Sequence, residues 1–142
     1  MMRTWTMLAL IGMALAGGPT LAAPLPSAWM GDSRNGCKVW NPQPQPEESV
    51  RWSGACVAGF ASGPGVTEWL EDGQVTESVE GGRVAGHLQG RGIQTLANGD
   101  RFEGTWKDDR REGPGTYTRA DGKRVTGVWI ADQLVSGPGQ AL

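Results

Sequence analysis

The chain has 142 residues, enough for about one domain, with 23 glycines, 9 prolines, 7 tryptophans and a net charge of −2. Glycine at this frequency disfavours long helices, because each one inside a helix costs about 1 kcal/mol relative to alanine. The composition therefore excludes a helix bundle, a large α/β enzyme and a strongly basic nucleic-acid-binding protein. It favours short strands joined by tight turns.

Residues 1–22 have the order of a secretory signal peptide. A positively charged start precedes an apolar run that is too short to span a bilayer. Cleavage after Ala22 places Thr20 and Ala22, both small side chains, at the third-last and last positions of the peptide. We therefore expect an exported, secreted protein of the periplasm that begins at Ala23. The alternative is an uncleaved amphipathic N-terminus, but the segment has no visible polar face.

The mature chain is expected to begin with a linker, residues 23–33, and an N-terminal cap, residues 34–49. Within the cap, residues 41–46 place proline at every second position, which favours polyproline II. Such a segment is either a stiff connector or a ligand for an aromatic groove. We expect the connector.

Two cysteines, Cys37 and Cys56, lie 19 positions apart. A small exported domain with a thin core gains from a cross-link, worth about 3 kcal/mol for a loop of this length. Zinc would need four ligands, and only His87 could join the cysteines without using carboxylates. We therefore predict a disulfide, with a zinc site or free thiols as the alternatives.

Glycines recur through residues 50–139 at 54, 81, 104 and 127, which gives spacings of 27, 23 and 23. Each unit is predicted to be a β-hairpin, because Phe102, Gly104 and Trp106 alternate with polar residues as in a half-buried strand. Gly-x-Gly is expected at the first reversal of each hairpin, and Asp-Gly or Asn-Gly at the second. The glycine inside the strand leaves room for an aromatic ring from the neighbouring unit.

These units predict an all-β fold, an elongated antiparallel meander of about four hairpins. Cys56 is expected at the inward position that Trp106 and Trp129 hold in later units, so that the bridge to Cys37 caps the N-terminal end of the stack. Arg83 stands at the same position in the second unit.

Three segments carry a family resemblance: Phe102-Glu-Gly-Thr-Trp-Lys, Glu112-Gly-Pro-Gly-Thr-Tyr and Ala120-Asp-Gly-Lys. They resemble the MORN repeat, the membrane occupation and recognition nexus motif, over residues 50–139. The resemblance implies a single-layer sheet of β-hairpins that serves as an interaction or scaffolding module without catalytic residues. Some relatives have been proposed to bind phosphoinositides, but an export signal would separate this chain from cytosolic phosphoinositides.

Few residues carry a signal of chemistry. His87 falls at the tip of a hairpin and is expected to be a solvated turn residue rather than a catalytic base. The acidic pairs Glu71-Asp72 and Asp108-Asp109 fall at predicted turns, where aspartate is favoured by its own backbone hydrogen bonds. We therefore predict no catalytic residue, no cofactor site and no metal site.

Charge is distributed unevenly along the chain. Residues 23–81 hold three basic and eight acidic side chains, a balance of −5, whereas residues 82–130 hold nine and six, a balance of +3. The basic excess gives a candidate anion-binding set at Arg110, Arg111, Lys123 and Arg124. The alternative is an ordinary solvated surface, because acidic residues are interleaved with these four.

A candidate partner surface lies in the last unit, where Val128 and Ile130 replace the polar Thr105 and Lys107 of the preceding unit. The predicted function is a non-enzymatic exported protein–protein interaction or scaffolding module of the cell envelope. Its partner would be an envelope protein or a second copy of the chain, and not nucleic acid. The alternatives are a binder of anionic envelope lipid or glycan through the basic half, and an accessory domain of an envelope enzyme.

Overall fold

The computed structural model describes residue 17 and residues 27–137, and this part of the chain consists of strands and turns without helix. The all-β prediction is confirmed. Apart from Gly17, the predicted signal peptide 1–22 lies outside the described residues, as does the predicted cleavage site. In the described part, no helix is long and apolar enough to cross a membrane.

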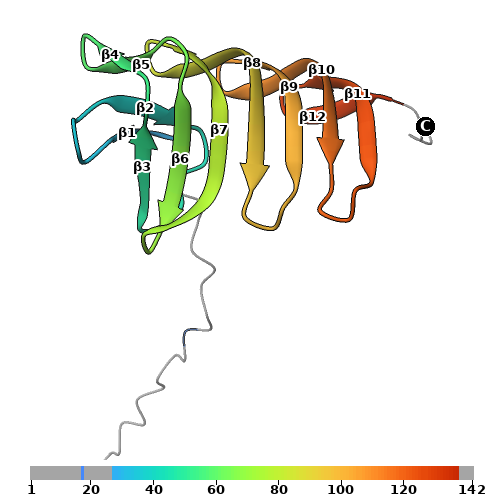
Figure 1. Ribbon diagram of the computed structural model, residues 1–142, viewed down its shortest axis with the longest axis horizontal. Helices are drawn as coiled ribbons and strands as arrows, with labels where there is room; N and C mark the ends of the chain where they lie inside the picture. The colour runs from blue at the N-terminus through green and yellow to red at the C-terminus, as the bar shows by residue number, and fades with distance from the viewer. Residues whose placement is uncertain (1–16, 18–26, 138–142) are drawn as a thin grey trace, which may run out of the picture.

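Eight strands form one long antiparallel sheet in the order β12-β11-β10-β9-β8-β7-β6-β3 (Figure 1). From β6 to β12 each strand pairs with the next in the chain, which is the predicted meander, and β3 pairs with β6 at the opposite edge. The strands of this sheet are β3 (Glu48–Trp52), β6 (Val66–Glu71), β7 (Gln74–Val84), β8 (His87–Leu96), β9 (Arg101–Lys107), β10 (Arg110–Thr118), β11 (Arg124–Ile130) and β12 (Gln133–Ser136).

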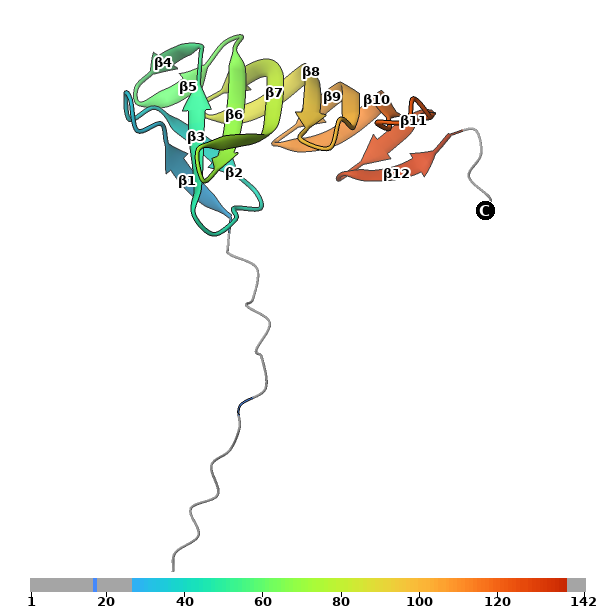
Figure 2. The ribbon, with the colours of Figure 1, turned by 60° about the horizontal axis from the view of Figure 1, so that its bottom comes forward.

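A second, smaller sheet lies at the N-terminal end of the long one (Figure 2). Its order is β1-β2-β5-β4, and only the contact between β2 and β5 is parallel. Its strands are β1 (Ala28–Gly31), β2 (Lys38–Asn41), β4 (Ala55–Val57) and β5 (Phe60–Ser62). Val39 of this sheet packs in one buried cluster with Val50, Trp52 and Trp69 of the long sheet, so the small sheet closes that end of the repeats.

A row of glycines crosses the long sheet and sets its shape. Five glycines of five successive strands pair directly with one another, namely Gly81, Gly92, Gly104, Gly115 and Gly127. A Cβ atom at Gly104 would lie 2.8 Å from the Phe102 ring and 2.8 Å from the Pro114 carbonyl oxygen. The ring at Gly104 thus belongs to the same strand, so the prediction of a ring from the neighbouring unit is wrong at this glycine. A ring of the following unit, that of Trp106, lies at Gly92 instead. The rings therefore lie directly on the backbone.

The inward face assignment is confirmed. Phe102, Gly104 and Trp106 are buried, while the residues between them are more exposed. Phe102 is in edge-to-face contact with both Trp106 and Trp129, with ring centroids 4.9 Å apart in each pair. These rings form the second buried cluster of the molecule, to which Val79 and Leu88 also belong.

The Gly-x-Gly prediction for the first reversal is wrong. The reversals there are two-residue turns at Ala85-Gly86, Asp108-Asp109 and Ala131-Asp132, in which both residues have positive φ. Two of the Gly-x-Gly segments lie inside strands, residues 90–92 in β8 and residues 113–115 in β10, whereas residues 63–65 lie between β5 and β6. Gly113 has a φ of 95° where the register of β9 and β10 shifts. The first glycine of the pair therefore forms a β-bulge rather than a turn.

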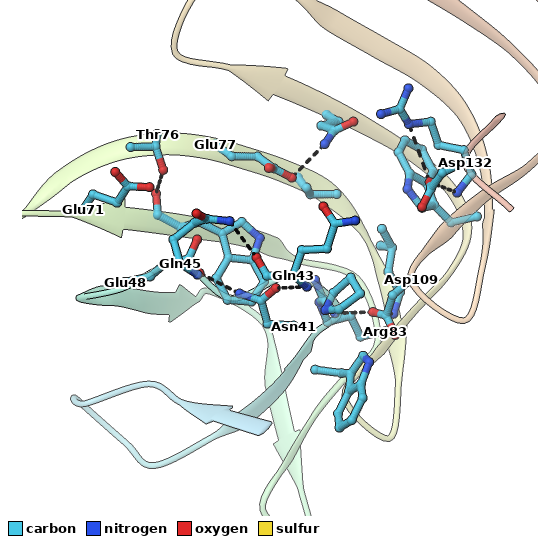
Figure 3. A pocket seen from close by; sticks show the side chains of 18 residues that line it. Asn41, Gln43, Gln45, Glu48, Glu71, Thr76, Glu77, Arg83, Asp109 and Asp132 are labelled. Carbon is cyan, nitrogen blue, oxygen red and sulfur yellow. Dashed lines mark hydrogen bonds and ion pairs between the residues drawn. The ribbon is translucent and has the colours of Figure 1, made fainter. Parts of the chain in front are cut away.

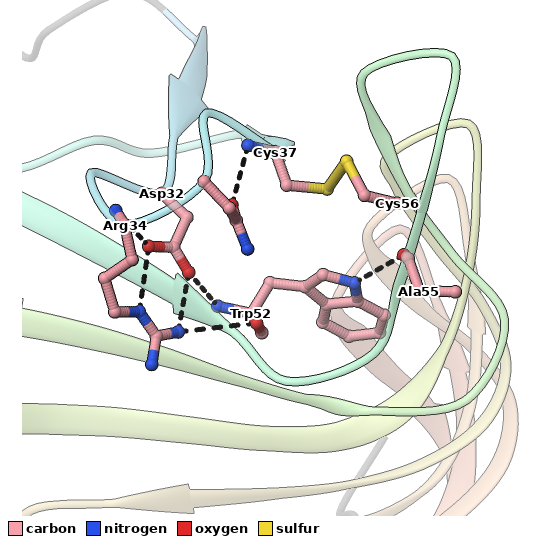
Figure 4. The surroundings of a disulfide bond; sticks show 7 residues. Asp32, Arg34, Cys37, Trp52, Ala55 and Cys56 are labelled. Atoms are coloured by element: carbon pink, nitrogen blue, oxygen red, sulfur yellow. Dashed lines mark hydrogen bonds and ion pairs between the residues drawn. A yellow bond between two sulfur atoms is a disulfide. The ribbon is translucent and has the colours of Figure 1, made fainter.

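The disulfide between Cys37 and Cys56 is present, with the two Cα atoms 5.9 Å apart (Figure 4). Cys37 is fully buried, but Cys56 is exposed, so the predicted inward position of Cys56 is wrong. The chain leaves the long sheet after β3, and the ring of Trp52 covers the backbone at Gly54 and Gly65 instead. The disulfide thus links β4 to the loop between β1 and β2 of the small sheet.

A buried carboxylate fixes the same region to the long sheet (Figure 4). Asp32 accepts a hydrogen bond of 2.6 Å from Arg34 Nη2 and one of 2.9 Å from the backbone N–H of Trp52. These donors hold the pKa of Asp32 well below its usual range. Because Trp52 ends β3, the contact ties the turn after β1 to the edge of the long sheet.

The glycine row predicts the cost of adding a methyl group. Gly104→Ala should destabilise the protein by about 1 to 3 kcal/mol, because the new Cβ meets backbone and ring atoms that cannot withdraw. Gly82→Ala is the matched control: it is another strand glycine, and its Cβ would have no neighbour nearer than 3.9 Å. Urea unfolding of both variants measures the difference. Equal midpoints would contradict the close approach at Gly104.

Candidate functional site

A groove of about 490 Å³ runs along the inward face of the long sheet (Figure 3). Its volume lies in the range of ligand sites. One wall is formed by inward side chains of β6 to β10, and the other by the segment from Trp40 to Glu48. The groove is therefore built between the repeats and the N-terminal part of the chain.

The proline-rich segment is fastened along the groove by hydrogen bonds. Glu48 Oε2 accepts a bond of 2.7 Å from Asn41 Nδ2 and one of 3.0 Å from the backbone N–H of Gln45. Asn41 Oδ1 in turn accepts a bond of 2.9 Å from the N–H of Gln43. These bonds hold the segment in place, and its amide side chains also line the groove.

Arg83 occupies the inward position that tryptophan holds in later repeats, and its side chain is buried. Its guanidinium donates to Thr67 Oγ1 at 2.9 Å and to the Gly86 carbonyl at 2.9 Å, and forms an ion pair of 3.1 Å with Asp109. Burial lowers the pKa of Arg83, and the charge of Asp109 opposes that shift. A buried cation thus replaces an aromatic ring here because a carboxylate of the next repeat is within reach.

Asp109 also joins neighbouring repeats through their backbones. Its Oδ1 accepts a bond of 2.9 Å from the N–H of Leu88, and its own N–H donates to the Leu88 carbonyl at 3.1 Å. The same pair of contacts recurs 23 residues later, between Asp132 and Arg111, at 2.8 and 3.1 Å. Aspartate at the second position of these two turns therefore links its hairpin to the one before it.

His87 differs from the expected solvated turn residue. Its Nδ1 lies 2.6 Å from Asp109 Oδ2, and its ring contacts Trp29 and Trp40 with centroids 5.1 and 5.6 Å away. Its side chain remains 32% exposed. This pairing was not predicted from the sequence. The 23-residue period nevertheless places Gly86, which precedes His87, and Asp109 at the same position of two successive turns.

Glu77 points into the groove from β7 (Figure 3). Burial raises the pKa of this carboxyl, the negative charge of Glu48 raises it further, and the charges of Arg111 and Arg83 act to lower it. Gln94 Nε2 donates a hydrogen bond of 2.8 Å to Glu77 Oε1, which partly offsets the shift. A carboxylate in these surroundings gains from a neighbouring cation.

The four candidate anion-binding residues lie at two separate places. Arg110 and Arg111 begin β10, whereas Lys123 and Arg124 lie at the other end of the same hairpin. Since β10 has 9 residues and a strand rises about 3.3 Å per residue, the two pairs are separated by roughly 25 Å. Arg111 forms an ion pair of 3.8 Å with Asp132. The four cations therefore do not converge on one patch.

The candidate partner residues of the last repeat are both exposed. Val128 is 38% and Ile130 53% exposed, and Val135 of β12 adds a further exposed apolar side chain. They lie on the last hairpin of the long sheet.

Binding is the chemistry that these sites offer. The groove presents amide and carboxylate side chains around the edges of buried tryptophans, an arrangement that can hold a polar ligand by hydrogen bonds and charge. Within residues 27–137, no three or more of the His, Cys, Asp and Glu side chains gather in a way that could hold a metal ion.

The aspartate links between repeats predict a contrast between two equivalent positions. Asp109→Asn should destabilise the protein by about 3 to 5 kcal/mol, because it leaves the buried charge of Arg83 unpaired. Asp132→Asn, its counterpart one repeat later, should cost about 1 kcal/mol or less, because Arg111 is partly exposed to water. Chemical unfolding of both variants measures the change in the free energy of unfolding. Similar changes would show that the ion pair of Arg83 and Asp109 contributes no more to stability than that of Arg111 and Asp132.

Comparison with known families agrees with this geometry. The MORN repeat family model matches two consecutive segments, residues 84–101 and residues 102–124. No curated protein matches the chain significantly. MORN repeats are commonly modules for protein or lipid interaction, and they are generally not enzymes. The match supports the MORN repeat family for the central hairpins of the long sheet, β8 to β10 with the turns that flank them.

Proposed function

We propose that this chain is a non-enzymatic, exported interaction module of the cell envelope, which binds another envelope protein or a second copy of itself. The MORN repeats at residues 84–124 support the role of an interaction module. The disulfide between Cys37 and Cys56 is compatible with an oxidising compartment outside the cytosol. The predicted signal peptide, residues 1–22, supports the same location.

The observation that carries the proposal is the difference between the two ends of the long sheet. The small sheet packs against the N-terminal end. At the other end, β12 pairs only with β11 among the described strands, and it lies beside the exposed side chains of Val128 and Ile130. A strand edge next to an apolar surface is a favourable place for a protein partner to add.

An anionic lipid or glycan fits the same structure less well. The basic residues of the C-terminal half lie at opposite ends of one hairpin, and Arg111 and Lys123 each have an acidic partner within 4.0 Å. The groove carries more carboxylates than guanidinium groups. We therefore favour a protein partner over an anionic one.

The C-terminal surface can be tested with a double variant. Val128→Thr with Ile130→Lys should weaken self-association, or cross-linking to the envelope partner, about tenfold or more, because it removes apolar contact area and adds a charge. Val57→Thr with Val84→Lys, at exposed valines elsewhere, is the control and should have no effect. Sedimentation and cross-linking in cells measure both. If the folded test variant behaves like the wild type, the C-terminal end is not the partner surface.

Export and oxidation are tested together on the protein isolated from cells. Its intact mass should correspond to a chain that begins at Ala23 and lacks two hydrogens, and no thiol should react with an alkylating reagent under denaturing, non-reducing conditions. Cys37 and Cys56 should both become reactive after reduction. A mass that includes residues 1–22 would contradict export with cleavage after Ala22.

A further inference from the structure

The charges that line the groove do not balance. Its lining contains five carboxylates and two guanidinium groups. Two of the carboxylates form ion pairs within the chain: Asp109 lies 3.1 Å from Arg83, and Asp132 lies 3.8 Å from Arg111. The three carboxylates that form no ion pair with another described residue are Glu48, Glu71 and Glu77. All three lie toward the end of the groove nearer the β6–β7 turn (Figure 3).

The opposite end of the groove, near the β7–β8 and β9–β10 turns, shows which group carboxylates of this groove bind. There the chain supplies its own guanidinium groups, and each lies next to a carboxylate. Arg111 in addition lies over the Phe102 ring, with its Cζ atom 5.0 Å from the ring centroid, and near the Tyr117 ring at 5.9 Å. A guanidinium held between a carboxylate and an aromatic face is a stabilising arrangement. The same groove therefore already binds two arginine side chains of this protein.

The end near the β6–β7 turn has carboxylates and aromatic rings, but none of the lining residues there is an arginine. Glu77 of β7 and Glu48 of the opposite wall both line this end of the groove (Figure 3). Trp69 contributes an aromatic edge, and Trp40 is a partly exposed ring of the opposite wall. The amide side chains of Gln43 and Gln45 line that wall and can hydrogen-bond to a peptide backbone.

We propose that this groove binds an extended segment of a partner protein that carries an arginine, whose guanidinium is held by Glu48 and Glu77. The inference rests on the proposed function in that it names a partner chemistry for a protein-binding module. It concerns a different surface from the C-terminal hairpin, so the two can fail independently. The negative balance of the groove favours a cationic protein segment over a lipid headgroup or an acidic chain.

The test uses the mature protein and a short labelled peptide of alternating arginine and glycine, acetylated and amidated at its ends. Binding is measured by fluorescence anisotropy against the same peptide with citrulline, the neutral isostere of arginine. The arginine peptide should bind at least about tenfold more tightly, because citrulline keeps the shape and removes the charge. Equal affinity for the two peptides would overturn the proposal.

Two variants locate the site. Glu77→Gln should weaken binding of the arginine peptide at least about tenfold, and its amide oxygen can still accept the bond from Gln94. Glu80→Gln makes the same charge change on the same strand, but Glu80 lines a separate pocket on the outer face, so affinity should stay within about twofold. Equal losses in both variants would show that only net charge attracts the peptide, and would overturn the groove as the site.

A further measurement distinguishes a failure of the groove proposal from a failure of the proposed function. The double variant Val128→Thr with Ile130→Lys should bind the arginine peptide as the wild type does, because neither residue lines the groove. If the wild type does not bind the peptide, the groove inference is overturned, and the sedimentation of the C-terminal variant still decides the proposed function. Spermine that binds more tightly than the peptide would likewise overturn the assignment to a protein segment.

Discussion

The long sheet depends on the close approach of aromatic rings to the backbone of glycine residues. Glycines paired across five strands let the rings of Phe102 and Trp106 lie on the sheet itself. A single-layer sheet has no second layer to cover its apolar face, so its core must be made from its own large side chains. The glycine row makes that possible by giving the rings room on the backbone. A groove runs along the same inward face.

The aromatic core is interrupted where the repeats meet the N-terminal part of the chain. There an aromatic layer is replaced by the buried pair of Arg83 and Asp109, which connects two hairpins and reaches His87. A buried ion pair is weak evidence for stability, but it fixes register and partners. Here it joins the second and third repeats, while the N-terminal end is held by the disulfide and by Asp32.

The proposed function rests on two features of the long sheet, its C-terminal edge and the groove on its inward face. One end of the long sheet is covered and the other ends in a short strand next to exposed valine and isoleucine side chains. Along the inward face, carboxylates accumulate beyond the number of arginines that could pair with them. Both features underlie the binding surfaces proposed above, and a binding role agrees with the common role of MORN repeats.

The sequence by itself determined the hairpin meander, the inward residues of β9 and the cysteine pair, because glycine spacing and alternation are local signals. It misplaced the first turn, since Gly-x-Gly suits a bulge as well as a reversal. It did not reveal the groove or the pairing of Arg83 and His87 with Asp109, because these residues meet only after successive repeats stack. Only the tertiary structure decides which charges remain unpaired, since pairing depends on distances between strands and not on order along the chain.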